Sequence, residues 1–318
     1  MRFAIKNINR KVAKENFGGF GSLHYTLKHI LLLFLCGYQN KPQSQFHSRG
    51  VVHSLQEFSF PIQLFAVRLN AMSTVYYNIG KYFLLMVNTF TKPEKRRVYP
   101  RLIVQEIDKI GLQSLGIVAL LSLFMGAVVT LQTAANIDSG WIPRWTIGFT
   151  TRQTMILEFS STIVCLILSG KVGGNIASEI GTMRITEQID AMEIMGINSA
   201  SYLILPKIVA ALFIFPFMVI LSMFIGISAG AFVGYTTSVT SLNDFEYGLQ
   251  YDFEMWQVSY SVIKTFFFAF IITSVSSYHG YYTHGGPREV GASSTRAVVY
   301  SMVLILIANY ILTQLLLL

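Results

Sequence analysis

Five long apolar runs in the later two thirds of the chain constrain its fold more than any other feature. They are Leu112 to Gln132, Gln153 to Ser169, Ile208 to Tyr235, Val258 to Tyr278 and Ala297 to Leu318. Each is close to the roughly 20 residues that a helix needs to cross a bilayer. Only 13% of the 318 residues are charged, against about a quarter in a soluble domain. The runs therefore predict an all-α integral membrane protein with five transmembrane helices.

The net charge of +8 does not indicate a nucleic-acid-binding protein. Residues 1–71 hold nine Lys and Arg against two acids, whereas residues 72–318 hold fifteen against fourteen. The excess charge thus belongs to the N-terminal part, and the membrane domain is nearly neutral. The two cysteines, Cys36 and Cys165, cannot build a disulfide framework or a metal site.

Residues 1–71 form a basic N-terminal extension without a clear hydrophobic period. Its one apolar run, Ile30 to Cys36, is too short to span a bilayer. Three interpretations are open: translation from an upstream start with Met72 as the true start, a basic targeting peptide, or a cytoplasmic tail. We expect this part to be disordered or to precede the true start, and the membrane domain to cover residues 72–318.

Residues 73–91 are aromatic-rich and amphipathic, and the basic stretch KPEKRRVYPR follows them directly. An apolar face beside a Lys/Arg cluster is typical of an interfacial helix on the anionic cytoplasmic leaflet. The alternative is a first spanning helix, which Asn78, Lys81 and Asn88 disfavour.

Cations gather in alternate loops, which predicts the orientation in the membrane. Those before the first span, after the second and around the loop after the fourth are Lys92, Lys95, Arg96, Arg97, Arg101, Lys109, Lys171, Arg184, Lys207, Arg288 and Arg296. Between Thr236 and Gln257 there are four acids and no Lys or Arg. The positive-inside rule therefore places the N-terminus and the segment from Gly170 to Pro206 in the cytoplasm, and the C-terminus outside.

The segment Gly170 to Pro206, GKVGGNIASEIGTMRITEQIDAMEIMGINSASYLILP, is charged and helix-patterned. Apolar side chains recur at helical spacing at Ile176, Ile180, Met183, Ile185, Ile189, Met192 and Met195. Glycines 170, 173 and 174 before it and Leu205-Pro206 after it predict one cytoplasmic helix bounded by bends, with Gly196 inside its end. Such a helix could dock a soluble partner through Glu179, Glu187, Asp190 and Glu193, or it could pack under its own bundle.

Enzyme signatures are missing from the sequence. There is no G-x-x-x-x-G-K-[ST] phosphate loop, no H-E-x-x-H and no G-x-S-x-G. His279 and His284 flank a Gly-rich turn, and we interpret them as interfacial loop residues in preference to a hydrolase site or a pH sensor.

Two features lie within the spans. Glu158 is an acid at membrane depth, where ionisable groups are costly and usually mark a pathway; the alternative is a solvated carboxylate near the interface. Gly226, Gly230 and Gly234 form a G-x-x-x-G-x-x-x-G run, and Gly126 lies in the first span. This spacing favours close helix packing, either within the chain or between two copies.

The Gly170 to Pro206 segment resembles the signature of the MlaE permease family, the membrane subunits of ABC systems that move phospholipid. The resemblance extends from about Met72 to the end, through GKYFLLMVNTFTKPE, the Glu158 region and THGGPREVGASSTRAVV. It implies a homodimeric permease in a bacterial inner membrane, with an interfacial helix, five spans and a cytoplasmic coupling helix between spans two and three. It also implies a separate ATPase that binds ATP, an Mce-domain lipid-binding protein outside, and phospholipid between the subunits.

The resemblance also assigns site residues. The ATPase would dock on Glu179, Arg184, Glu187, Asp190 and Glu193, and Glu158 would lie on the substrate pathway. Where the family commonly has an arginine before that acid and a proline after it, this chain has neither, and Arg152 is a candidate substitute as its ion partner. Two other functions stay open: a permease for another hydrophobic solute, and a membrane scaffold that transports nothing.

Overall fold

The structure is a computed structural model that describes residues 76–91, 99–137 and 142–317. Every regular element in these ranges is a helix, and none of the described residues forms a strand. Five helical stretches are long and apolar enough to cross a membrane: Tyr99–Asn136, Trp145–Ile185, Ser199–Thr236, Met255–Tyr281 and Pro287–Leu316. For the described residues, the prediction of an all-α fold with five helices long and apolar enough to span a membrane is confirmed, whereas the interpretations of residues 1–71 fall outside them.

The first two stretches consist of α-helices joined by π-helical segments, and each of the other three is a single α-helix. The first contains α4 (Tyr99–Ile107), η1 (Asp108–Leu112) and α5 (Gln113–Asn136). The second contains α6 (Trp145–Thr154), η2 (Met155–Ile163), α7 (Val164–Leu168), η3 (Ser169–Gly173) and α8 (Gly174–Ile185). Then follow α9 (Gln188–Ile194), α10 (Ser199–Thr236), α11 (Leu242–Gln250), α12 (Met255–Tyr281) and α13 (Pro287–Leu317).

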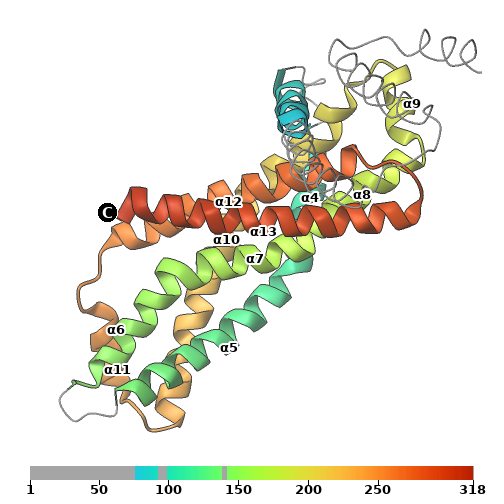
Figure 1. Cartoon of the computed structure of the whole chain (residues 1–318). Coiled ribbons are helices and arrows are strands. Elements are labelled where there is room, and N and C mark those ends of the chain that lie inside the picture. The colour runs from blue at the N-terminus through green and yellow to red at the C-terminus, as the bar shows by residue number, and fades with distance from the viewer. Residues whose placement is uncertain (1–75, 92–98, 138–141, 318) are drawn as a thin grey trace, which may run out of the picture. The chain divides into compact units, whose positions relative to one another are not determined.

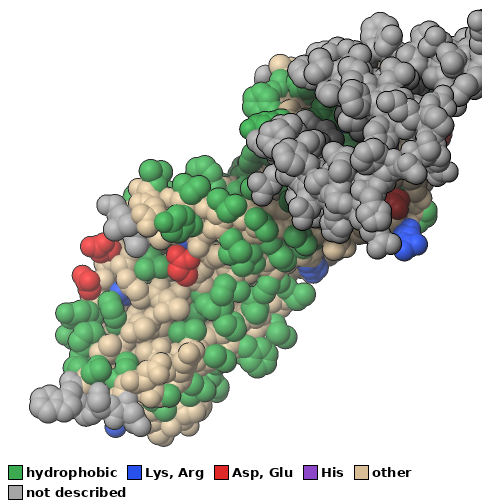
Figure 2. Space-filling view, viewed as in Figure 1, with side chains coloured by type: hydrophobic (Ala, Val, Ile, Leu, Met, Phe, Trp, Pro, Cys, Tyr) green, Lys and Arg blue, Asp and Glu red, His purple; other side chains and the backbone are tan. Residues whose placement is uncertain are grey.

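The membrane unit has two ends of different composition. The helices α4, α8 and α9 lie at one end, and α6 packs against α11 at the other (Figure 1). Hydrophobic side chains cover much of the visible face between them, and acids appear near the end that carries α6 and α11 (Figure 2). A helix bundle that is apolar on its outside is what a bilayer requires. The acid-rich stretch around α11 thus lies at the end opposite α4, α8 and α9.

Glycines allow α5 and α10 to pack at unusually close range. A Cβ atom on Gly126 would lie 1.9 Å from the Gly226 carbonyl oxygen, and one on Gly230 would lie 2.4 Å from Thr130 Oγ1. Across the same contact, Ser122 Oγ donates to Ser222 Oγ at 2.7 Å. Of the two uses predicted for the glycine run, packing within the chain therefore accounts for it.

The bend predicted at the glycines before the charged segment is wrong. Helical structure continues without interruption through Gly170, Gly173 and Gly174, because these residues lie in η3 and at the start of α8. Gly173 instead makes room for α12, since a Cβ there would lie 2.8 Å from Ser276 Oγ. The segment's helix is thus an extension of the second span.

The bend predicted at Leu205-Pro206 is also wrong. The helix α10 begins at Ser199, where Asn198 Oδ1 accepts a hydrogen bond from the Ser201 amide at 3.4 Å, and Pro206 lies inside it. The third span therefore starts earlier than Ile208, and Lys207 becomes part of its buried wall with 3% of its side chain exposed.

A separate helix over residues 76–91 precedes the five stretches and rests one face on the bundle. Its buried face includes Leu85, Met86 and Thr89, whereas Phe83, Leu84 and several other large apolar side chains are exposed. Tyr82 OH donates to Ser274 Oγ of α12 at 2.8 Å, and burial raises the pKa of this phenol, so it stays protonated as a donor. A helix over this stretch is confirmed, whereas its amphipathic character and its interfacial position stay predictions.

Candidate functional site

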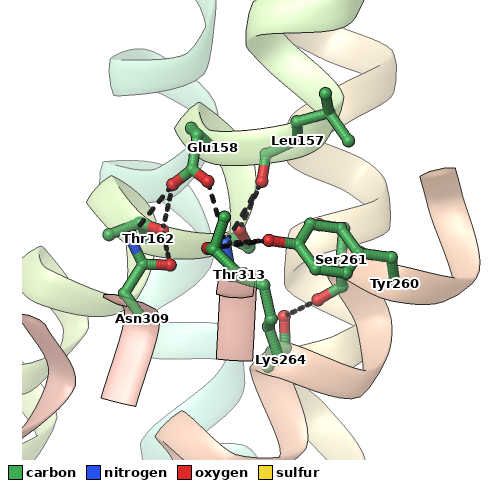
Figure 3. Close-up of polar contacts among 10 residues, drawn as sticks. Leu157, Glu158, Thr162, Tyr260, Ser261, Lys264, Asn309 and Thr313 are labelled. Carbon is green, nitrogen blue, oxygen red and sulfur yellow. Dashed lines mark hydrogen bonds and ion pairs between the residues drawn. The ribbon is translucent and has the colours of Figure 1, made fainter. Parts of the chain in front are cut away.

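A polar cluster joins three helices inside the apolar bundle. It brings together Glu158 from η2, Lys264 from α12 and Asn309 from α13 (Figure 3). Lys264 Nζ lies 3.1 Å from Glu158 Oε1 and 3.1 Å from Tyr260 OH, and it donates to the Leu157 carbonyl at 3.4 Å. The ammonium thus has three oxygen acceptors around it.

The second carboxylate oxygen of Glu158 is also occupied. Oε2 accepts from Thr162 Oγ1 and from Asn309 Nδ2, each at 3.1 Å. The Lys264 side chain is 0% exposed, whereas that of Glu158 is 46% exposed. A buried ammonium is stable only when its charge is compensated, and Glu158 is the counter-ion of Lys264. Glu158 is also the exposed member of the pair.

Arg152 does not pair with Glu158, so the substitution proposed for the family's arginine is wrong. The Arg152 guanidinium points toward the end of α11. Its Nη1 donates to the carbonyls of Leu249 and Tyr251 at 2.6 and 3.0 Å, and its Nη2 donates to the Asp252 carbonyl at 3.2 Å. It therefore holds the end of α11 and the residues after it.

Sequence reasoning missed the actual partner, Lys264. The residue lies within the apolar run Val258 to Tyr278, and an ionisable group at that depth is itself a signal of function. Applying to the lysine the rule that singled out Glu158 would have identified both members of the pair. Asn309 and Tyr260 carry no comparable signal, because polar side chains without charge are common in helix contacts.

The charged segment folds as two helices and not as the single one predicted. The helix α8 ends at Ile185, and Glu187 adopts a left-handed conformation with φ of 61° before α9 begins. Apolar spacing continues across this break, so periodicity does not reveal it. Gly196, with φ of 78°, ends α9: its amide donates to the Glu193 carbonyl and that of Ile197 to the Met192 carbonyl, a Schellman cap.

Four of the five predicted docking residues surround this break. Arg184 Nη1 lies 2.7 Å from Asp190 Oδ1 and bridges α8 and α9. Glu193 Oε1 accepts from Ser199 Oγ and from Tyr281 OH, each at 2.9 Å, while Glu187 is exposed. Beside them Ile194 and Met195 are 88% and 67% exposed. The tip thus combines acids with an uncovered apolar patch.

The fifth, Glu179, lies apart from the other four, one turn and more before the end of α8. Its carboxylate contacts Lys207 Nζ at 2.7 Å and Lys109 Nζ at 3.0 Å. It also lines a groove of about 620 Å³ between the α4–η1 region and α8. Both of its oxygens are therefore engaged within the chain.

His279, one of the two histidines at the Gly-rich turn, has an aromatic partner. His279 stacks on Tyr300 with 5.2 Å between ring centroids. In the part of the chain that the structure describes, no group of three or more His, Cys, Asp and Glu residues could hold a metal ion.

Comparison with known proteins relates the chain to one family. The family model described as Permease MlaE matches residues 103–315, which reach into all five apolar stretches. A probable ABC transporter permease protein of Rickettsia bellii is 36% identical over 243 residues, covering 75% of this chain and 92% of the relative.

Two further relatives have more descriptive names. The Intermembrane phospholipid transport system permease protein MlaE of Haemophilus influenzae is 28% identical over 235 residues, covering 73% of this chain and 88% of its own. The chloroplastic Protein TRIGALACTOSYLDIACYLGLYCEROL 1 of Arabidopsis thaliana is 30% identical over 220 residues, covering 69% of this chain and 63% of its own.

Proposed function

The chain belongs to the MlaE family of ABC transporter permeases, and on that premise we propose that it is the membrane subunit of an ABC system that moves phospholipid between membranes. The observation that carries the proposal is the continuous family match across all five apolar stretches. A relative named as a phospholipid transport permease supports the substrate class.

The motor is a separate ABC ATPase in this proposal, because the sequence contains no phosphate loop. The docking surface is the tip formed by α8 and α9. Its support is the exposed apolar pair Ile194 and Met195 beside Glu187, Asp190 and Arg184. An uncovered apolar patch ringed by charges is typical of a protein interface, in which the apolar part anchors and the charges orient.

The proposal also includes an orientation in the membrane and further partners. We place the N-terminus and α9 in the cytoplasm, the C-terminus outside, and the chain in a bacterial inner membrane. Support comes from Lys109, Arg184 and Lys207, which lie on η1, α8 and α10, and from the stretch between Thr236 and Gln257, which holds four acids and no Lys or Arg. Two copies would pair as a homodimer, with an Mce-domain lipid-binding protein on the outer side.

The substrate pathway in this proposal passes the polar cluster around Glu158. The carboxylate is the open member of a pair whose other member, Lys264, is completely buried. Charges at membrane depth are costly, and they are retained where they face a bundle interior or a path for polar groups. A phospholipid headgroup that moves through an apolar bundle needs such a polar contact.

Mass spectrometry of the purified permease–ATPase complex tests the substrate class. We expect phospholipid to co-purify at a defined stoichiometry and to be depleted after ATP is added, because lipid held in the bundle would be released on turnover. The control is the same complex with ATP omitted. Enrichment of a different hydrophobic solute, with phospholipid only at the level of the surrounding detergent extract, would contradict the proposal.

A further inference from the structure

Four charged side chains from three spans form a closed ring at the end of the unit that carries α9. Glu106 lies on α4, Lys109 on η1, Glu179 on α8 and Lys207 on α10. Lys207 Nζ lies 2.9 Å from Glu106 Oε2 and 2.7 Å from Glu179 Oε2. Lys109 Nζ lies 3.0 Å from Glu179 Oε1 and 3.8 Å from Glu106 Oε1. Each carboxylate therefore bridges the same two lysines.

The two lysines of this four-residue ring contribute unequally. Lys109 is 53% exposed, so water and salt weaken its pairs. Lys207 is 3% exposed and depends on Glu106 and Glu179 for the compensation of its charge. The part of the ring that ties the helices firmly is thus the Glu106–Lys207–Glu179 chain, which connects the first, third and second spans.

Apart from the ring, α8 makes few contacts with the first and third spans. The helix α8 packs closely on α12 and α13, whereas the groove of about 620 Å³ separates it from the α4–η1 region. Glu106, Lys109 and Glu179 all line that groove. Because Glu179 and Arg184 belong to the same helix, a displacement of the α8–α9 tip also moves Glu179.

We infer that the Glu106–Lys109–Glu179–Lys207 ring transmits the motion of the α8–α9 tip to the first and third spans. Glu179 is then a positioning residue and not an ATPase contact, because both of its carboxylate oxygens are already held by lysines. The inference rests on the proposed function, since the ATPase supplies the motion.

The test compares ATP hydrolysis with lipid transfer in the purified permease–ATPase complex carrying Glu179→Gln. We expect the ATPase to co-purify in full and to hydrolyse ATP, while the lipid moved per ATP falls about tenfold, a size common for coupling between sites. Lys207→Met should have the same effect. The double variant should be no worse than either single one, because residues that act as one unit are not additive.

Two control variants isolate the ring. Asp108→Asn removes an acid two residues from Glu106 that is exposed and forms no ion pair with any described residue, so the transfer ratio should stay unchanged. Lys207→Arg keeps the central cation and should retain most of the ratio. A ratio lowered equally by Asp108→Asn would mean that any charge change at this end has the effect, which contradicts a specific role for the ring.

Three outcomes for Glu179→Gln would overturn the inference. Loss of the ATPase would make Glu179 a docking contact, an unchanged ratio would leave the ring without a role in coupling, and failure of the chain to fold would make the ring a stability element. Each leaves the proposed function intact. That function fails by a different result, the absence of ATP-driven lipid transfer in the wild-type complex.

Discussion

A complex in which Glu187 and Asp190 are both replaced by lysine is expected to lose its ATPase completely on purification. Both acids lie at the α8–α9 tip beside the exposed Ile194 and Met195. Two reversals change the charge of this small surface by four units, and like charges facing each other across an interface cost several kcal/mol. The measurement is the amount of ATPase that co-purifies with the tagged permease from detergent. An intact complex would show that docking occurs elsewhere.

One complication is that Asp190 also pairs with Arg184 across the break between the two helices. Asp190→Lys could therefore act by disturbing α9. The exchange variant Arg184→Asp/Asp190→Arg keeps that ion pair and the net charge. If the exchange restores ATPase binding, Asp190 acts through the pair, and Glu187 carries the direct contact. As a matched control, Glu246→Lys/Glu254→Lys reverses two exposed acids near the opposite end and should leave ATPase binding unchanged.

Removing the carboxylate of Glu158 is expected to destabilise the chain more than removing its partner lysine. Glu158→Leu leaves the completely buried ammonium of Lys264 without a counter-ion, which costs on the order of 3–5 kcal/mol. Lys264→Met leaves a carboxylate that is 46% exposed and keeps its bonds to Thr162 and Asn309, so the loss should be smaller. Thermal unfolding in detergent, followed by tryptophan fluorescence, gives the order of the two.

The double variant separates stability from transport. Glu158→Leu/Lys264→Met removes both charges and should recover much of the lost stability, because an apolar pair replaces an ion pair at little cost. If the cluster lies on the lipid path, transport should stay low in this stable variant. Wild-type transport would make the pair purely structural. Thr313→Val, which removes an uncharged acceptor of Tyr260, should cost only about 1 kcal/mol.

The number and order of the spans could be predicted because each contains an apolar run of the length that a membrane-spanning helix needs. Their ends could not, because a helix does not stop where its apolar run stops. The second span continues from Ser169 through charged α8 to Ile185, and its glycines fit against α12 and α13 instead of bending the chain. Likewise α10 begins at Ser199, where Asn198 caps its first turn, and Pro206 lies inside the helix instead of ending it.

The candidate site could be predicted only in part, because the sequence does not show which helices pack together. Acids could be found individually, but their partners come from other helices. Arg152 is six residues from Glu158 in sequence yet faces the opposite end, whereas Lys264 lies 106 residues away and contacts it. Glu179 is an acid like those predicted for docking, and only the structure shows that Lys109 of η1 and Lys207 of α10 hold its carboxylate. Sequence spacing reports one helix face and not what packs against it.

Whether the chain is a phospholipid permease is decided by ATP-driven transfer of phospholipid in the reconstituted complex. The permease and its ATPase are placed in donor vesicles that contain fluorescent phospholipid, with the Mce-domain protein present and lipid-free acceptor vesicles supplied. The account predicts transfer that requires ATP, stops when the ATPase is inactivated, and falls in the Glu187→Lys/Asp190→Lys complex. Transfer at the same rate without ATP, or none from a complex that hydrolyses ATP, would contradict it.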